Sequence, residues 1–249
     1  MATSIPPRPR SLAPSVDSSL GLKLLPTVLS VIAGSADVSS FLGLGGLFVA
    51  HITGNLVILA AHLVTGTRVE VALLLSVPVF ILVLALTRLL AAGLEAIGVA
   101  SLRPLLLLQL LLLAGFLAVG VAAGPRIDPN AAATIVAGML GVAAMAVQNA
   151  MVQLSLREAP STAVMTTNIT RFVMDVGEVL LGRDPDELAQ ARRRAARAWP
   201  TIVGFTVGAA LGAALFAAVG VWSLALPAGL ALLALAMGLE RGLDGGRRR

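Results

Sequence analysis

Long apolar runs separated by short polar breaks fill most of the chain between residues 24 and 239. About 20 consecutive apolar residues in a helix cross the hydrocarbon core of a bilayer, and most of the runs approach that length. Divided at their polar breaks, the runs predict eight spans: residues 24–44, 47–64, 71–92, 105–122, 131–156, 162–181, 200–219 and 221–239. The pattern therefore predicts an all-α, polytopic transmembrane helix bundle.

The composition supports this class of protein. Of the 249 residues, 57% are hydrophobic and 12% are charged, and the mean hydropathy is +0.94. Soluble chains have about 45–50% apolar and about 25% charged residues. The chain contains no cysteine, which excludes a disulfide framework, a thiolate nucleophile and a Cys-ligated metal centre. Any chemistry must use oxygen and nitrogen groups.

The distribution of Lys and Arg predicts the orientation, because cytoplasmic loops carry the excess of positive charge. With eight spans and the N-terminus inside, fourteen of the 18 basic residues lie on the cytoplasmic side. Only Arg103 and Arg157 lie outside, and Arg88 and Arg171 fall within spans. An even number of spans with both termini in the cytoplasm is therefore favoured. Six spans remain an alternative, because the weakest span, 162–181, contains several charges.

A short motif recurs and suggests an internal repeat. Thr53 and Asn55 form a Thr-x-Asn pair that returns 113 residues later as Thr166 and Asn168. The interpretation is two four-helix transmembrane repeats, residues 21–124 and 125–240, with a basic cytoplasmic loop at 183–198 in the second. Because each unit has an even number of spans, the two copies are expected to enter the membrane in parallel. Residues 1–20 predict a disordered cytoplasmic tail, and 241–249 a basic cytoplasmic tail.

Several of these residues carry a family resemblance. The segments Ala33-Gly-Ser-Ala-Asp37 and Phe48-Val-Ala-His-Ile-Thr-Gly-Asn55, with Gln148-Asn149 followed by Thr166-Thr-Asn168, resemble the YoaK-like family, domain of unknown function 1275. The resemblance extends from about residue 24 to residue 239. It implies a multi-pass protein of the bacterial inner membrane, often described as a permease, without an established substrate. The second motif departs from the family, since Thr167-Asn168 stands where Thr-Gly is common.

Polar groups inside the predicted spans are the candidate functional residues, because a charge at a helix centre costs about 2.5–3.5 kcal/mol on insertion scales. Asp37 is the single acidic residue within the first five spans. At 1.5 Å per residue, it lies roughly 10–12 Å below the outer surface, as do Asn55, Asn149 and Asn168. The expected substrate-binding or pathway residues are Asp37, Thr53, Asn55, His62, Gln148, Asn149, Thr166, Asn168, Arg171, Asp175 and Glu178. The asparagines have a second interpretation as hydrogen-bonding contacts between packed helices.

Two helices carry these residues as polar stripes. Asn168, Arg171, Asp175 and Glu178 share one helix face, and Arg171 is placed to pair with Asp175. His51, Asn55 and His62 share a face of the second span. The stripes predict either the lining of a hydrophilic path or, alternatively, a structural ion pair and histidines at the membrane interface. Arg88 has two expected positions, the outer interface or a contact with Asp37.

Other features define partners and cofactors. The two histidines of the second span are about 16 Å apart along the helix axis, so no metal site is expected. No cofactor, no phosphate-binding loop and no nucleic-acid partner are expected either. Asp184-Pro-Asp-Glu187 followed by the basic stretch 192–197 predicts an amphipathic helix on the cytoplasmic surface, in contact with anionic membrane lipids or, less simply, with a soluble protein. Gly204, Gly208 and Gly212 form a ridge for close packing, within the bundle or in a homo-oligomer.

These expectations lead to one functional hypothesis and two rivals. The hypothesis is a secondary transporter or permease that moves a small polar solute between the second and sixth spans. Proton coupling would use Asp37, Asp175 or Glu178. One rival is a non-transporting scaffold or lipid-interacting protein. The other is an intramembrane enzyme with Asp37 and the histidines as acid and base, although the absence of known catalytic motifs favours a protein that is not an enzyme.

Overall fold

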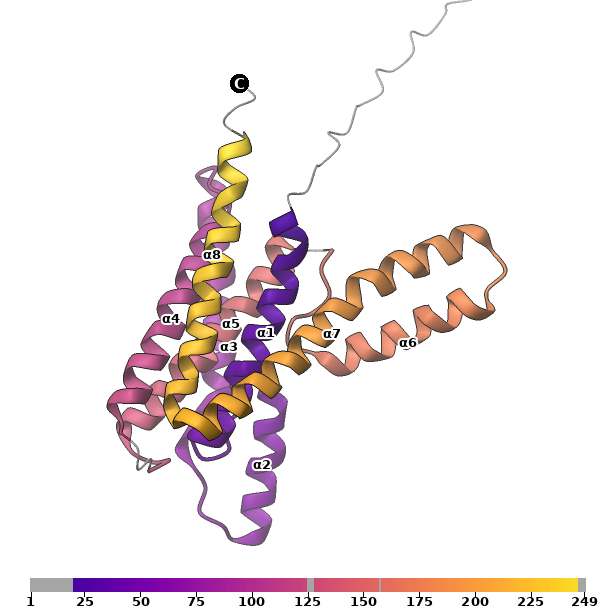
Figure 1. The fold of residues 1–249 in the computed structure, drawn as a ribbon. Coiled ribbons are helices and arrows are strands. Elements are labelled where there is room, and N and C mark those ends of the chain that lie inside the picture. Colours follow the sequence, from indigo (N-terminus) through magenta and orange to yellow (C-terminus); the bar gives the residue numbers. More distant parts are fainter. Residues whose placement is uncertain (1–19, 125–127, 157, 246–249) are drawn as a thin grey trace, which may run out of the picture.

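The computed structural model describes residues 20–124, 128–156 and 158–245, and all regular structure in these ranges is helical. Figure 1 shows the arrangement, with α1 and α5 inside the bundle. The helices are α1 Leu20–Gly43, α2 Ile52–Thr65, α3 Val71–Ala96, α4 Leu102–Ala122, α5 Ala132–Ser155, α6 Met165–Leu181, α7 Pro185–Val219 and α8 Ala225–Gly245, with a 3-10 turn, η1, at Gly220–Leu224. The predicted tail 1–20 lies outside the described residues except for Leu20. The predicted tail 241–249 is partly helical, because α8 continues to Gly245.

Five stretches are long and apolar enough to cross a membrane: Leu24–Gly43, Val71–Ala96, Leu102–Ala122, Ala132–Ser155 and Pro185–Leu239. The last of these contains α7 and most of α8. The chain is therefore a multi-pass membrane protein. Helices α2 and α6, with 14 and 17 residues, are shorter than the roughly 20 residues of a complete span. The predicted spans 47–64 and 162–181 each begin with a segment that is not helical.

The break between α1 and α2 follows from two glycines. Gly45 and Gly46 adopt φ of +72° and +82°, a left-handed conformation that glycine reaches without steric cost. The chain therefore turns back after α1, and residues 47–51 run beside the end of that helix before α2 begins. A comparable break separates α5 from α6, where residues 156–164 are not helical.

Helix α7 begins within the segment 183–198, for which the sequence predicts a basic loop with an amphipathic helix that starts at Asp184. The side chain of Asp184 accepts a hydrogen bond from the backbone N–H of Asp186 (2.9 Å), and Pro185 occupies the first turn. This is a favoured helix start. The Ala- and Arg-rich sequence that follows has high helix propensity, so the amphipathic segment and the predicted seventh span form one helix of 35 residues. Pro200 lies inside this helix and does not end it.

The directions of the helices follow from contacts along their lengths. Ser101 at the start of α4 bonds to Ser155 at the end of α5 (3.1 Å), so these helices are antiparallel. Gln148, in the C-terminal half of α5, donates to the carbonyl of Leu29 in the N-terminal half of α1 (2.9 Å). Gly138, near the start of α5, packs against Leu47, which follows the C-terminal end of α1. Helices α1 and α5 are therefore also antiparallel. This contradicts the expected parallel orientation of the two halves.

The glycine ridge lies at the interface of α1 and α7. Gly204, Gly208 and Gly212 are buried against successive turns of α1, at Thr27, Val31 and Ser35, so these two helices run parallel. A Cβ atom on Gly208 would lie 2.3 Å from the carbonyl oxygen of Val31. The ridge therefore permits close backbone approach within one chain. The structure thus has the packing within the bundle that was one of the two expectations for this ridge.

Candidate functional site

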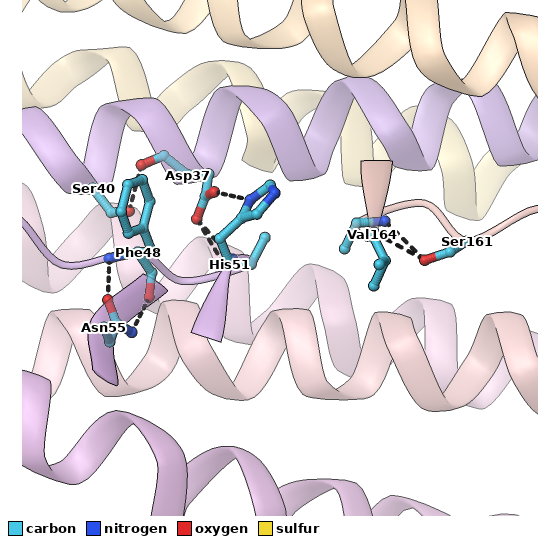
Figure 2. A network of polar contacts seen from close by, with 9 residues as sticks. Asp37, Ser40, Phe48, His51, Asn55, Ser161 and Val164 are labelled. Atoms are coloured by element: carbon cyan, nitrogen blue, oxygen red, sulfur yellow. Dashed lines mark hydrogen bonds and ion pairs between the residues drawn. The ribbon is translucent and has the colours of Figure 1, made fainter. Parts of the chain in front are cut away.

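Asp37 lies in the last two turns of α1, beside the break between α1 and α2, and its carboxylate binds the segment that leads into α2 (Figure 2). Oδ1 accepts hydrogen bonds from the backbone N–H groups of Ala50 (2.7 Å) and His51 (3.3 Å). Oδ2 lies 2.6 Å from Nδ1 of His51. The side chain of Asp37 is only 3% exposed. Both donors directly precede α2, whose N-terminus carries a partial positive charge that also stabilises the carboxylate.

The imidazole of His51 connects this buried carboxylate to the surface. Its side chain is 39% exposed, and its ring lies edge-on to those of Phe48 and Phe205, with centroids 6.1 and 5.3 Å away. A histidine that donates from Nδ1 to a carboxylate has Nε2 available to gain or lose a proton. The pair thus joins a buried carboxylate to an imidazole that can exchange a proton at the surface of the described chain. Arg88 lies exposed on α3, and the partners of Asp37 come from residues 50 and 51.

Asn55 holds the segment before α2 in place. Its Nδ2 donates to the carbonyl of Phe48 (2.8 Å), and its Oδ1 accepts from the N–H of the same residue (2.9 Å). Asn168 makes a similar contact at the start of α6, because its Nδ2 donates to the carbonyl of Ser161 (2.6 Å). Each asparagine thus bonds to the backbone seven residues earlier. Thr53 and Thr166, which share the motif, are exposed.

The two helix starts differ in the group that receives their N–H bonds. At α2 the acceptor is Asp37, which lies on another helix. At α6 the acceptor is Oγ of Ser161, which binds the N–H groups of Ala163 (3.4 Å) and Val164 (3.0 Å). The donating amides, Ala50 and His51 at α2 and Ala163 and Val164 at α6, are again 113 residues apart. A neutral local cap at α6 thus replaces the buried carboxylate at α2.

Gln148 forms a second buried polar cluster with residues that the sequence analysis did not select. Its Nε2 donates to the carbonyl of Leu29 (2.9 Å) and to Oγ1 of Thr162 (2.9 Å), and its Oε1 accepts from Nε2 of Gln109 (2.6 Å). Asn149 instead donates to Met145 within its own helix. Among the described residues, Asn149, which the sequence places at the depth of Asp37, therefore joins neither the Asp37 contacts nor the Gln148 cluster. The sequence gives one indication of a role for Gln109, because it is a single amide side chain within a run of leucines.

The ion pair on α6 has a different partner from the expected one. Asp175 accepts hydrogen bonds from Nε (2.8 Å) and Nη2 (2.7 Å) of Arg194 on α7. Arg171 is exposed, and no ion pair joins it to Asp175 among the described residues. Helix α7 runs back beside α6, which brings Arg194 opposite the carboxylate (Figure 1).

The remaining expected residues lie apart from the Asp37–His51 pair. Glu178 is partly buried near Gly182 at the end of α6. Nδ1 of His62 lies 3.1 Å from the carboxylate of Glu70, just before α3. His51, Asn55 and His62 therefore do not line one face of a single helix, because His51 precedes α2 and contacts Asp37.

A groove of about 460 Å³ brings together part of the α6 stripe and the basic part of α7. Its polar lining includes Asn168, Arg171 and Asp175 from α6, Arg194 and Arg197 from α7, and Glu158 from the connection after α5. Nη1 of Arg197 lies 3.1 Å from Glu158. The amphipathic helix expected here carries Arg194 and Arg197, but its pattern did not predict that they lie beside Asp175 and Glu158.

Comparison with known proteins gives a result at the level of the family. No curated protein matches the sequence, and no solved structure matches the chain. The family described as "Protein of unknown function (DUF1275)" matches residues 25–237, from α1 through most of α8. This match covers most of the chain and confirms the resemblance drawn from the motifs at Asp37 and Asn55. The chain therefore belongs to the DUF1275 family.

Proposed function

We propose that the protein is a secondary transporter that moves a small polar solute across the bacterial inner membrane, coupled to protons. The observation that carries this proposal is the contact between the buried carboxylate of Asp37 and the partly exposed imidazole of His51. Ionisable residues within a membrane bundle are costly and typically mark ion or substrate pathways. Here the pair lies at an interrupted helix, the kind of position at which transporters bind solutes and coupling ions.

The proposed architecture is an inverted repeat of α1–α4 and α5–α8. Packing of equivalent helices supports it: α1 contacts α7 and α8, and correspondingly α5 contacts α3 and α4. Helix α2 packs on α3 as α6 packs on α7. The antiparallel directions of α1 and α5 give the two units opposite orientations. Each unit begins with an interrupted helix, which is a recurrent feature of secondary transporters.

In this architecture each unit crosses the membrane three times. Helix α2 continues in the direction of α1 (Figure 1), so the two helices together make one crossing. Helix α5 crosses by itself, because α6 runs out sideways from the bundle beside the first half of α7 (Figure 1), and α7 and α8 make the next two crossings. Assigned by the helix ends that each connection joins, fourteen of the 18 basic residues again lie on the side of both termini. Arg68 and Arg126 then lie outside, in place of Arg103 and Arg157. Six crossings with cytoplasmic termini thus satisfy the charge rule as well as eight do.

The transport cycle assigns specific roles to the pair. When His51 receives a proton from the outer side, its imidazolium forms a charge-assisted hydrogen bond with Asp37. When the proton is released, the carboxylate still keeps the bonds to Ala50 and His51 N–H that fix the start of α2. Protonation therefore changes the charge at the break between α1 and α2, and this change biases the position of α2 relative to α1.

Proteoliposomes test the proposal. Purified protein is reconstituted with the pH dye pyranine inside, and amino acids, monocarboxylates, dicarboxylates, inorganic phosphate, sugars and polyamines are added in turn. A transporter coupled to protons changes the internal pH with at least one class, and protein-free liposomes show no such change. A panel without solute-dependent proton movement and without uptake of radiolabelled solute overturns the proposal.

The Asp37–His51 pair also favours a second candidate, an intramembrane enzyme that uses the pair as acid and base. A carboxylate that orients and charges a histidine is a common catalytic arrangement. The two functions differ in one observable. An enzyme converts its substrate in detergent solution, where no gradient exists, whereas a transporter recovers every solute chemically unchanged.

A further inference from the structure

The groove between α6 and the first half of α7 is separate from the Asp37–His51 pair and has its own chemistry. Its lining contains the guanidinium groups of Arg171, Arg194 and Arg197. The carboxylates in the same lining are those of Asp175 and Glu158. The groove thus has one positive charge more than its own acidic residues neutralise.

The three arginines are not equivalent. Arg194 is committed to Asp175, because its Nε and Nη2 both bind Oδ1 of that carboxylate. Asp175 is 10% exposed, and separating a largely buried carboxylate from its partner is costly. Nη1 of Arg194 additionally donates to Gln190 (3.2 Å). These bonds hold the guanidinium group of Arg194 in a fixed position at the side of the groove.

Arg197 and Arg171 are available to a ligand. Arg197 makes one contact of 3.1 Å with Glu158, and the two side chains are 53% and 83% exposed. Exposed ion pairs of this kind contribute about 0–1 kcal/mol, so an external anion competes with Glu158 at little cost. Arg171 is exposed at the same groove and has no ion pair within the described part of the chain.

We infer that this groove binds an oxyanion, a carboxylate or phosphate group, through Arg197 and Arg171. Planar guanidinium groups bind both kinds of oxyanion by paired hydrogen bonds. Asp175 acts as a positioning residue, since it orients Arg194 and keeps the net charge of the groove low enough for reversible binding. The oxyanion belongs either to a free solute or to the headgroup of an anionic lipid. Binding does not depend on transport, so this inference and the proposed function fail independently.

The test uses the full chain in nanodiscs of phosphatidylcholine. Inorganic phosphate and succinate are titrated by isothermal calorimetry, with sodium chloride at equal ionic strength as the reference. A second set of nanodiscs contains phosphatidylglycerol, which separates a lipid headgroup from a free anion. Arg197→Gln and Arg171→Gln remove the binding groups, while Arg193→Gln removes an exposed charge of α7 that does not line the groove. Arg197→Lys serves as a conservative variant that keeps the charge.

We expect saturable binding of phosphate or succinate, or enrichment of phosphatidylglycerol at the protein, that each glutamine variant weakens about tenfold or more. Arg193→Gln binds as the wild type does, and Arg197→Lys has an intermediate affinity because it keeps the charge without the planar fork. Near-ultraviolet circular dichroism establishes that each variant is folded. The inference is overturned if none of the three probes binds above the salt reference, or if Arg193→Gln weakens binding as much as Arg197→Gln does.

Discussion

Arg194 of α7 places two nitrogens, Nε and Nη2, within 2.8 Å of a single carboxylate oxygen of Asp175 on α6. This contact joins α6, with 17 residues, to α7, with 35 residues. Because Asp175 is largely buried and Arg194 is half exposed, the two partners respond differently to mutation. The contact therefore provides a direct test of how α6 is held.

Asp175→Leu should lower stability modestly, since the unpaired Arg194 regains water. Arg194→Leu should cost more, about 1–3 kcal/mol, because it leaves a buried carboxylate without its donor. The double variant should recover much of that loss. Arg171→Leu is the matched control and should change little. Thermal unfolding in detergent measures all four, and a larger loss for Arg171→Leu than for Arg194→Leu would restore the pairing expected from the sequence.

Asn55→Ala should destabilise the protein more than Asn168→Ala. Asn55 makes two hydrogen bonds to the backbone of Phe48, whereas Asn168 makes one to Ser161. Each buried backbone group left without a partner costs about 1–3 kcal/mol. The free energy of unfolding, measured with denaturant in mild detergent, should therefore be lowest for Asn55→Ala. Equal stability of both variants and the wild type would contradict the structural role of these asparagines.

Gly208→Ala should destabilise the bundle, because its new Cβ would lie 2.3 Å from the backbone of Val31. The matched control is Gly229→Ala in α8, where the added methyl group meets no atom within 4 Å of the described chain. The control should be neutral or slightly stabilising through helix propensity, by up to about 1 kcal/mol. Melting temperatures compare the two variants. A neutral Gly208→Ala would show that α1 and α7 are not in close contact.

Single cysteines at Thr67 and Ala100 separate six crossings from eight, and the chain has no cysteine of its own. With six crossings Thr67 lies outside and Ala100 inside, because α3 starts at the outer face. With eight spans the two positions are reversed. Gln190 lies inside in both cases and is the control. Labelling of intact cells with an impermeant maleimide should modify the cysteine at position 67 and spare those at 100 and 190; the reverse pattern would contradict the inverted repeat.

The sequence predicts the long helices well but not the two interrupted ones. Apolar length alone identifies α3, α4 and α5, because a continuous hydrophobic run has few other structures in a membrane. Residues 47–51 are as apolar as a span, so composition could not show that they turn back after Gly45 and Gly46. Counting them as helix gave an even number of spans per unit, and hence the parallel orientation that α1 and α5 contradict.

The candidate site was predicted in part. Asp37 stood out as a lone carboxylate in an apolar helix, and the structure places it at an interrupted helix with a histidine. Its pairing with His51 was not predicted, because the pairing depends on the turn that brings residue 51 back to the level of residue 37. Arg194 was missed for a similar reason. Its contact with Asp175 depends on the packing of α7 beside α6, which the amphipathic pattern of the basic segment does not reveal.

Asp37→Asn tests the central claim of proton coupling through the Asp37–His51 pair. The amide keeps the shape of the carboxylate and can accept the backbone N–H bonds, but it cannot hold the charged pair with His51. The control is Glu95→Gln, the same change at an exposed site on α3. The measurement compares proton-driven solute uptake with solute exchange across proteoliposomes at equal pH. We expect Asp37→Asn to lose proton-driven uptake and to retain solute exchange, while Glu95→Gln retains both. A stable Asp37→Asn protein with unchanged, pH-dependent uptake would contradict proton coupling through this pair.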